Sequence, residues 1–520
     1  MFETAKLKAR RNAAKGERDQ FQPLLDEAYQ YTIPFRKSTR NTGTGEKRVD
    51  QVFDHTAIDA AFRFAGKFQQ DFWPPGQDNF ELAPGPTVPA AEKEKLAEGL
   101  KPVSDVAQSF FQDGDWDIAF HEMGLDLNAG NGAILMNPSA SDEPDKLWNP
   151  ISVSMDELLW ENGPNNKISA IFWDRKMSIR VLMDTWPEGD FGTDLKELFA
   201  NKPEDQIEVH VDTIWDRKRR RWDMLVWCEK QEKIIFKSES RTCPWLTVRY
   251  FRVPGETYGR GNAMLAMPSI KTVNTVARLQ LQAAAIAMLG IYTAVDDGVF
   301  NPDLAPLEPG VFWKVARNGG TLGPSINRFP DPRLDLSNLV LNDMRSSVKA
   351  TMLDESLPPE NAAVKSATEI IERVKRLAAD YLGSFGRLVN DIVVQAIKRV
   401  IELAYNMGLI SNEIPIDQLL VKVKVKSPLA IARETARIEK IVQWLEMVLQ
   451  ILASTGAPGG VNRIVHLEKL MTDVGREMGV PAEYIVTEEQ RAAIDKQEAE
   501  KQAALMALQA ATTGAIPGVE

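Results

Sequence analysis

The sequence predicts an α+β protein that is mainly helical, and three stretches lead to this prediction. Residues 263–290 form a nearly continuous apolar run that favours one long helix. Residues 133–253 are rich in aromatic and other strand-favouring side chains, eight tryptophans among them. Residues 366–407 keep apolar positions at helical spacing over roughly 60 Å, which is long for a compact domain.

The helix at residues 263–290 carries one narrow polar stripe on an otherwise apolar surface. Lys271, Asn274, Arg278 and Gln282 follow at intervals of three and four residues, so they share one face. An apolar rod must be buried by neighbours, and its polar stripe must meet water or a ligand. A core helix pair with a solvated edge satisfies both requirements without any ligand.

A second helix is predicted after a β-rich insert at residues 291–329. The insert contains short extended pieces and turn signals such as Asp297-Gly298. Asp331 can cap the second helix and Pro332 suits its first position. The order helix, β-rich insert, helix is the feature around which we expect the chain to be organised.

Four helices and one strand are predicted before residue 133. The helices are residues 1–32, ended by Pro34, then 54–72, 90–112 with an interruption at Pro102, and 116–128; the strand is residues 80–82. The first helix should bury Leu24, Leu25, Ala28 and Tyr31. The second should bury Ile58, Phe62, Ala65, Phe68 and Phe72.

A hairpin is predicted at residues 210–229, with the basic run 217–221 at its tip. Such a run matches a nuclear-targeting or nucleic-acid-binding pattern. A solvated hairpin tip explains it equally well and needs no partner.

The C-terminal third is predicted to be helical around one strand. A loop at 354–365 precedes a capping box of Ser366 and Glu369, and the helix that follows ends at Gly408, with a bend near Gly383 and Gly386. Residues 421–426 alternate valine and lysine and favour a strand. Its lysines could meet phosphates or protect an exposed edge. Further helices are predicted at 430–452, 461–478 and 487–511.

Length, charge and cysteine content favour a multidomain globular protein over a secreted, membrane or generally nucleic-acid-binding one. At 520 residues the chain is long enough for two to four domains, and its net charge of −11 argues against a surface that attracts nucleic acid throughout. Two cysteines, Cys228 and Cys243, favour free thiols in a reducing compartment. The sequence also lacks an obvious signal peptide, and its longest uncharged run favours a buried helix over a membrane span.

The motifs of several enzyme and cofactor classes are incomplete in this sequence. A calcium-loop start at Asp113 lacks its turn glycine, because Ile118 takes that place, and a zinc-helix start at His121 has Leu125 where the second histidine belongs. Gly259 and Gly261 lack the third glycine of a dinucleotide loop. We therefore expect no enzyme, no cofactor and no metal.

Eight short motifs, spread in order over most of the chain, carry a resemblance to a known family. They are YQYTIP at 29–34, VFDHTA at 52–57, FWPP at 72–75, FEL at 80–82, GETYGRG at 255–261, PSIKTVN at 268–274, ATE at 367–369 and KSPLA at 426–430. Together they resemble the portal proteins, or head-to-tail connectors, of short-tailed, T7-like bacteriophages. His55 and Trp73 depart from the residues we expect there.

The resemblance implies a portal-type subunit with wing, two-helix stem, small β-rich clip and helical crown. Its parts would be an N-terminal wing at 1–262, stem helices at 263–290 and 331–353, a clip at 291–330, a channel loop at 354–366, a long wing helix and strand at 367–428, and a crown or tail at 429–520.

The resemblance also implies a function and a location. Such proteins form a ring, typically a dodecamer, at one capsid vertex of the virion, and double-stranded DNA is packaged and ejected through it. The implied partners are further copies of the chain, the DNA, terminase, a tail adaptor protein, and the major capsid and scaffold proteins, with assembly in the cytoplasm of a bacterial host and no membrane.

Two sets of site residues follow from this placement. Lys271, Arg278, Lys349 and Lys365 are candidates for transient phosphate contacts in the DNA channel. Asp296, Asp297, Phe300 and Phe312 are candidates for partner docking on the clip. No catalytic, cofactor-binding or metal-binding residue is implied.

Two alternatives remain open at this point. A helical scaffold or adaptor without a channel would be a monomer or a dimer. A nuclease subunit would need a carboxylate cluster, for which Asp296-Asp297 is the local candidate, although a turn explains this pair more simply.

Overall fold

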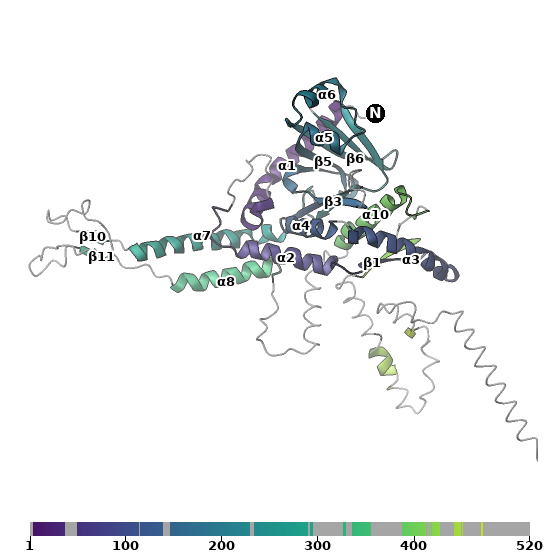
Figure 1. The fold of residues 1–520 in the computed structure, drawn as a ribbon. Helices are drawn as coiled ribbons and strands as arrows, with labels where there is room; N and C mark the ends of the chain where they lie inside the picture. The colour runs from purple at the N-terminus through teal and green to yellow at the C-terminus, as the bar shows by residue number, and fades with distance from the viewer. Residues whose placement is uncertain are drawn as a thin grey trace, which may run out of the picture. The chain divides into compact units, whose positions relative to one another are not determined.

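The computed structural model describes residues 4–36, 49–113, 115–138, 146–228, 233–289, 292–294, 326–328, 335–354, 387–411 and 419–426, with a few residues between 414 and 471. The chain divides into two units, residues 1–365 with 379–425 and residues 366–378 with 426–520. Of the second unit, short pieces such as the helical stretch 443–448 are described. Helices and strands both contribute, as predicted for an α+β protein (Figure 1).

Two antiparallel sheets form the strand-rich part of the chain (Figure 1). The larger has the order β4–β5–β6–β7–β8 and the smaller the order β3–β2–β9. Their strands are β2 (Asn131–Pro138), β3 (Trp148–Ser152), β4 (Leu158–Asn162), β5 (Ile168–Ser178), β6 (Gln206–Asp216), β7 (Arg221–Cys228), β8 (Ile234–Ser240) and β9 (Trp245–Arg249), with helices α5 (Ile179–Thr185) and α6 (Gly192–Asn201) between β5 and β6. The β-rich prediction for residues 133–253 is confirmed, as is the hairpin.

Helices α1 (Thr4–Thr32), α2 (Thr56–Phe72) and α4 (Trp116–Asn128) share a core with these strands. On α2, Phe64, Phe68 and Phe72 are spaced four residues apart and stack in sequence, with ring centroids 5.9 and 4.5 Å apart. Phe68 also stacks on Phe120 of α4 at 5.7 Å. Burial of one such ring contributes about 1.5–3 kcal/mol, so this aromatic column joins α2 firmly to α4.

On α1 and α2, the side chains that are buried differ in part from those that the sequence predicted to be buried. On α2, Phe62 is 43% exposed and stacks on Phe35, whereas Phe64 is fully buried. On α1, Leu24 is 40% exposed and Tyr29 is fully buried. Both helices contact neighbours on more than one side, so their buried surface is wider than one stripe and spacing alone does not give its direction.

Helix α3 (Ala90–Asp113) continues through Pro102, and the predicted interruption there is wrong. Proline cannot donate the hydrogen bond back to residue 98, which weakens the helix at this point. Burial of Leu100, Ala107 and Phe110 on the same helix offsets the missing bond.

A two-stranded antiparallel sheet joins β1 (Phe80–Pro84) to β12 (Val421–Val425). Both strands were predicted, but their pairing was not. Lys424 lies opposite Glu81, a favourable cross-strand pair of charges. Lys422 and Lys424 lie on the same face of this two-stranded sheet, and both sequence interpretations of these lysines stay predictions.

Helices α7 (Asn262–Leu289) and α8 (Asp335–Thr351) lie side by side (Figure 1). Between them in sequence, β10 (Tyr292–Ala294) pairs antiparallel with β11 (Ile326–Arg328). The order helix, β insert, helix is thus confirmed. The predicted start of the second helix, at Asp331 and Pro332, lies outside the described residues.

The helix that precedes β12 is described from Arg387. It contains a π-helical turn at Asn390–Val394, continues as α10 (Gln395–Asn406), and ends at Gly408, whose φ of +75° favours glycine. The predicted stop at Gly408 is confirmed. The capping box, the bend, the loop at 355–365 and the helices at 461–478 and 487–511 lie outside the described residues, except for two helical residues at 470–471.

Gly130 and Gly259 lie where two backbone segments approach each other closely. Gly130 has a φ of +112°, and a β-carbon on it would lie 2.5 Å from the carbonyl oxygen of Gly259 and 2.7 Å from the nitrogen of Gly261. The Asn131 side chain bridges the segments, accepting from Gly259 N at 2.6 Å and donating to Gly259 O at 2.9 Å. Gly259 and Gly261 of the GETYGRG motif thus have a packing role.

Gly130→Ala should lower the free energy of unfolding by about 2–4 kcal/mol, because it combines an unfavourable φ with a backbone clash. Urea denaturation measures the change. Gly99→Ala is the matched control, since Gly99 lies within α3 with no atom within 4 Å, and it should stabilise by up to about 1 kcal/mol. Equal effects of the two substitutions would contradict this account.

Candidate functional site

The pair α7–α8 is the candidate functional site, because three of the four predicted channel residues lie on it. Lys271 and Arg278 are on α7 and Lys349 is on α8. Lys365 lies outside the described residues. The clip candidates Asp296, Asp297, Phe300 and Phe312 also lie outside them.

The three described cations have different surroundings. Lys271 Nζ lies 2.6 Å from Glu27 Oε1 of α1, and both side chains are about two-fifths exposed at 43% and 42%. The Arg278 guanidinium lies 5.7 Å from the centre of the Phe53 ring and is exposed. Lys349 is exposed near the end of α8. Arg278 and Lys349 are therefore better placed to meet a phosphate than Lys271 is.

The polar stripe of α7 holds a segment of the same chain. Asn274 is 8% exposed; its side-chain oxygen accepts from Phe53 N at 2.6 Å and its nitrogen donates to Gln51 O at 3.0 Å. The expectation of a solvated stripe is therefore wrong at its centre. The stripe satisfies the backbone of residues 51–53, which would otherwise lose hydrogen bonds against an apolar helix.

Helix α8 is attached to α2 and the residues before it by two ion pairs. Arg345 Nη2 lies 2.6 Å from Asp54 Oδ2, and Arg63 Nη1 lies 3.3 Å from Asp354 Oδ1. Burial opposes ionisation of Asp54, yet hydrogen bonds from Thr56 and Arg345 hold its pKa below the usual value. No sequence motif indicated these pairs, because their partners are almost 300 residues apart in the chain.

Two of the motifs that carried the family resemblance, VFDHTA and PSIKTVN, meet at α7 and α8. VFDHTA supplies Phe53 and Asp54, and PSIKTVN supplies Asn274, so two motifs far apart in sequence are in contact. YQYTIP supplies Tyr29, whose hydroxyl donates to Asp126 Oδ1 at 2.8 Å. VFDHTA and PSIKTVN thus attach the helix pair to the rest of the subunit, whereas YQYTIP joins α1 to α4.

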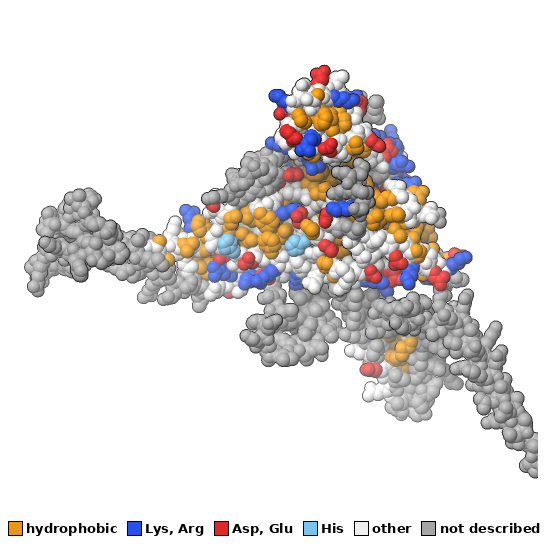
Figure 2. All heavy atoms as spheres, viewed as in Figure 1, with side chains coloured by type: hydrophobic (Ala, Val, Ile, Leu, Met, Phe, Trp, Pro, Cys, Tyr) orange, Lys and Arg blue, Asp and Glu red, His pale blue; other side chains and the backbone are white. Residues whose placement is uncertain are grey.

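Leucines on α7 are left uncovered. Residues up to Ala277 bury one side of the helix in the core, but from 278 to 285 every residue is exposed or partly exposed. Leu265, Leu279 and Leu281 are 58%, 57% and 59% exposed. Figure 2 shows hydrophobic side chains at the surface along this part of the molecule. Such a surface indicates a contact with another molecule.

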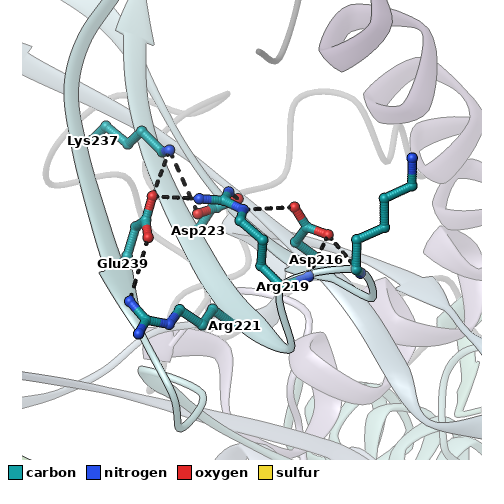
Figure 3. A network of polar contacts seen from close by, with 7 residues as sticks. Asp216, Arg219, Arg221, Asp223, Lys237 and Glu239 are labelled. Carbon is teal, nitrogen blue, oxygen red and sulfur yellow. Dashed lines mark hydrogen bonds and ion pairs between the residues drawn. The ribbon is translucent and has the colours of Figure 1, made fainter.

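The basic hairpin tip between β6 and β7 is partly neutralised within the chain (Figure 3). Arg219 lies 2.9 Å from Asp216, 2.5 Å from Asp223 and 2.6 Å from Glu239, which also pairs with Lys237. The carboxylates of Asp216 and Glu239 raise the pKa of Arg219. The structure therefore favours the solvated hairpin tip over the nucleic-acid pattern.

Among the residues that the structure describes, no group of three or more His, Cys, Asp or Glu side chains is placed to hold a metal ion. No described helix combines the length and the hydropathy needed to cross a bilayer.

An α+β subunit with exposed leucines along a long helix is typical of proteins that act by contacting other molecules. The sequence matches the family of the bacteriophage head to tail connecting protein over residues 4–486, and the chain belongs to this family. Curated proteins provide no match. The protein is thus a structural component of a phage virion, and its family implies contacts with capsid and tail components.

Proposed function

We propose that the chain is the portal of a short-tailed, T7-like phage. Copies form a ring, typically a dodecamer, at one capsid vertex, and double-stranded DNA is packaged and ejected through its channel. The observation that carries the proposal is the uncovered, leucine-bearing part of α7, within a chain that belongs to the connector family.

The positions of the exposed leucines suit a ring. Leu279 and Leu281 are two residues apart and therefore point to nearly opposite sides of α7. In a closed ring each subunit contacts two neighbours through different surfaces, so both sides of a stem helix need an apolar contact. Burial of both leucines by neighbouring copies removes the exposed surface.

The remaining parts are assigned by the same proposal. Residues 1–262 and 367–428 form the wing, 263–290 and 331–353 the stem, 291–330 the clip, 354–366 the channel loop and 429–520 the crown or tail. Terminase and then a tail adaptor dock on the clip, where the docking candidates are Asp296, Asp297, Phe300 and Phe312. Capsid and scaffold proteins surround the wing during assembly in the host cytoplasm.

The charge of the chain suits a channel in which DNA slides. Tight binding to many phosphates would hold the duplex in place, because each neutralised phosphate adds affinity. A subunit with net charge −11 and a few exposed cations guides the duplex with brief contacts. Arg278, Lys349 and Lys365 are the proposed contacts, and Lys271 takes part when it leaves Glu27.

Charge reversal at the exposed cations should change the amount of DNA that the head retains. In Arg278→Glu/Lys349→Glu particles we expect several-fold less retained DNA with rings still intact, because like charges then face the duplex. Gel analysis of packaged DNA measures the effect. Lys202→Glu, on an exposed residue after α6, is the control. Normal DNA content in the double variant would rule out these contacts.

Labelling of virions separates the portal from a scaffold or adaptor without a channel. Gold-labelled antibody against the chain should mark one vertex of each tail-less head. Label over the whole shell, or label that leaves with the tail alone, would favour the other class.

A further inference from the structure

A cavity of about 990 Å³ lies apart from the α7–α8 pair. It is lined by the ends of β5 to β8, by β9, and by the helical segment 387–406. All of these belong to the first unit of the chain. Its volume is in the range of sites that hold a small-molecule ligand.

The described lining of this cavity is strongly basic. Seven cationic side chains line it, against three carboxylates, in a chain whose net charge is −11. The carboxylates already have partners. Glu239 pairs with Arg219 and Lys237, and Glu402 accepts from the backbone nitrogens of residues 241 and 242.

The third carboxylate, Asp391, is shared between two guanidinium groups. It lies 2.7 Å from Arg252 and 3.8 Å from Arg387. The Nε atoms of both arginines are buried and have no hydrogen-bond partner. One carboxylate therefore serves two arginines and leaves donors of both unused, although burying a donor without a partner is unfavourable.

Three more cations line the cavity, and no described carboxylate forms an ion pair with them. Arg249 is 3% exposed, and its guanidinium donates to neutral acceptors, among them Thr257 O at 3.1 Å. Burial lowers the pKa of Arg249 to about 10, and Arg252 adds to the effect. Among the described residues, the Lys398 and Lys167 side chains form no ion pair. Burial together with Lys167 lowers the pKa of Lys398.

Two aromatic side chains border the same cavity. Trp215 and Trp222 lie opposite each other on β6 and β7, with ring centroids 5.4 Å apart, and both are partly buried. An indole face is a surface on which a nucleobase stacks favourably. Cations and aromatic faces in one cavity suit a ligand with phosphates and a planar ring.

We propose that this cavity binds a phosphate-bearing ligand of nucleotide type. Lys167, Lys398, Arg252 and Arg387 contact the phosphates, and Trp215 and Trp222 contact the base. The phosphates come either from a free nucleotide or from a DNA strand. The site is independent of the proposed channel, because none of the channel candidates lines it.

Titration of the purified full-length protein with inorganic tripolyphosphate tests the proposal by calorimetry. We expect saturable binding with one site per chain. Lys167→Gln/Lys398→Gln should weaken it at least about tenfold, since one charge-assisted hydrogen bond contributes about 1.5–3 kcal/mol. The Lys167 and Lys398 side chains donate no hydrogen bond to any described residue, so the fold should persist in this variant. The midpoint of thermal unfolding checks that it does.

Two matched variants complete the test. Lys167→Arg/Lys398→Arg should keep binding within about threefold, and Lys196→Gln/Lys202→Gln, which removes the same charge outside the cavity, should leave it unchanged. Displacement of tripolyphosphate by a nucleoside triphosphate assigns the ligand to free nucleotides, and displacement by a short DNA assigns it to the strand. Absence of saturable binding, or equal loss in both glutamine variants, would overturn the proposal.

Discussion

Replacing Arg36 by methionine will lower the free energy of unfolding by about 3–5 kcal/mol at neutral pH, because it leaves a buried carboxylate without its cation. Arg36 Nη2 lies 2.5 Å from Asp126 Oδ2, and Arg36 Nη1 lies 2.9 Å from Glu122. Asp126 is fully buried, and its other oxygen accepts only from Tyr29 and the same guanidinium among the described residues. The group joins α1, α4 and β3, since Arg36 also donates to Ser152 at 2.9 Å.

The loss should depend on pH in a defined direction. Burial raises the pKa of Asp126 above 3.8, and Arg36 and Tyr29 offset part of this rise. Without Arg36 the folded-state pKa rises further above the unfolded value. The loss of stability caused by Arg36→Met is therefore complete above the folded-state pKa of Asp126. It disappears as the pH falls toward the pKa of Asp126 in the unfolded chain.

Urea denaturation at pH 7 and pH 5 measures this effect, and the deficit should be smaller at pH 5. Arg36→Met/Asp126→Asn is the matched control, because it removes the carboxylate as well and should recover most of the loss. An equal deficit at both pH values, with no recovery in the double variant, would show that Arg36 acts through packing alone.

Ring assembly should fail in Leu279→Asp/Leu281→Asp. The two leucines are 57% and 59% exposed, so their burial by neighbours would contribute about 2–3 kcal/mol for the pair. Its loss weakens each contact roughly 30- to 150-fold, and the added charges weaken it further. Sedimentation velocity at micromolar concentration should show free subunits in place of rings.

A control distinguishes this interface from a general effect of surface charge. Ile118 on α4 is 62% exposed, and Ile118→Asp makes the same chemical change away from α7. Rings should persist in this variant. Intact rings in the α7 variant would mean that the leucines are not at a contact between copies.

Local signals predicted most of the helices and strands well. The apolar run at 263–290, the tryptophan-rich strands and the glycine stop at Gly408 each depend on neighbouring residues only, and the structure confirms them. Predictions that depended on distant partners were weaker. Pro102 was expected to interrupt α3 and does not, and Phe62 was expected in the core but is 43% exposed. In both cases packing against other elements decided the structure.

In the candidate site, too, features set by neighbouring residues were predicted and features set by distant partners were missed. The stripe on α7 was visible in the sequence, but its partner at residues 51–53 lies more than 200 residues away and no spacing rule connects them. The ion pairs Arg345–Asp54 and Arg63–Asp354 were missed for the same reason. Only the joint presence of VFDHTA and PSIKTVN could have suggested the contact.

The central claim is that copies of this chain form a ring with a channel. Native mass determination of the purified protein, with electron-microscope images of the same sample, tests it most directly. The account predicts rings of about a dozen copies with a central hole. A stable, compact dimer would contradict it and would favour an adaptor without a channel.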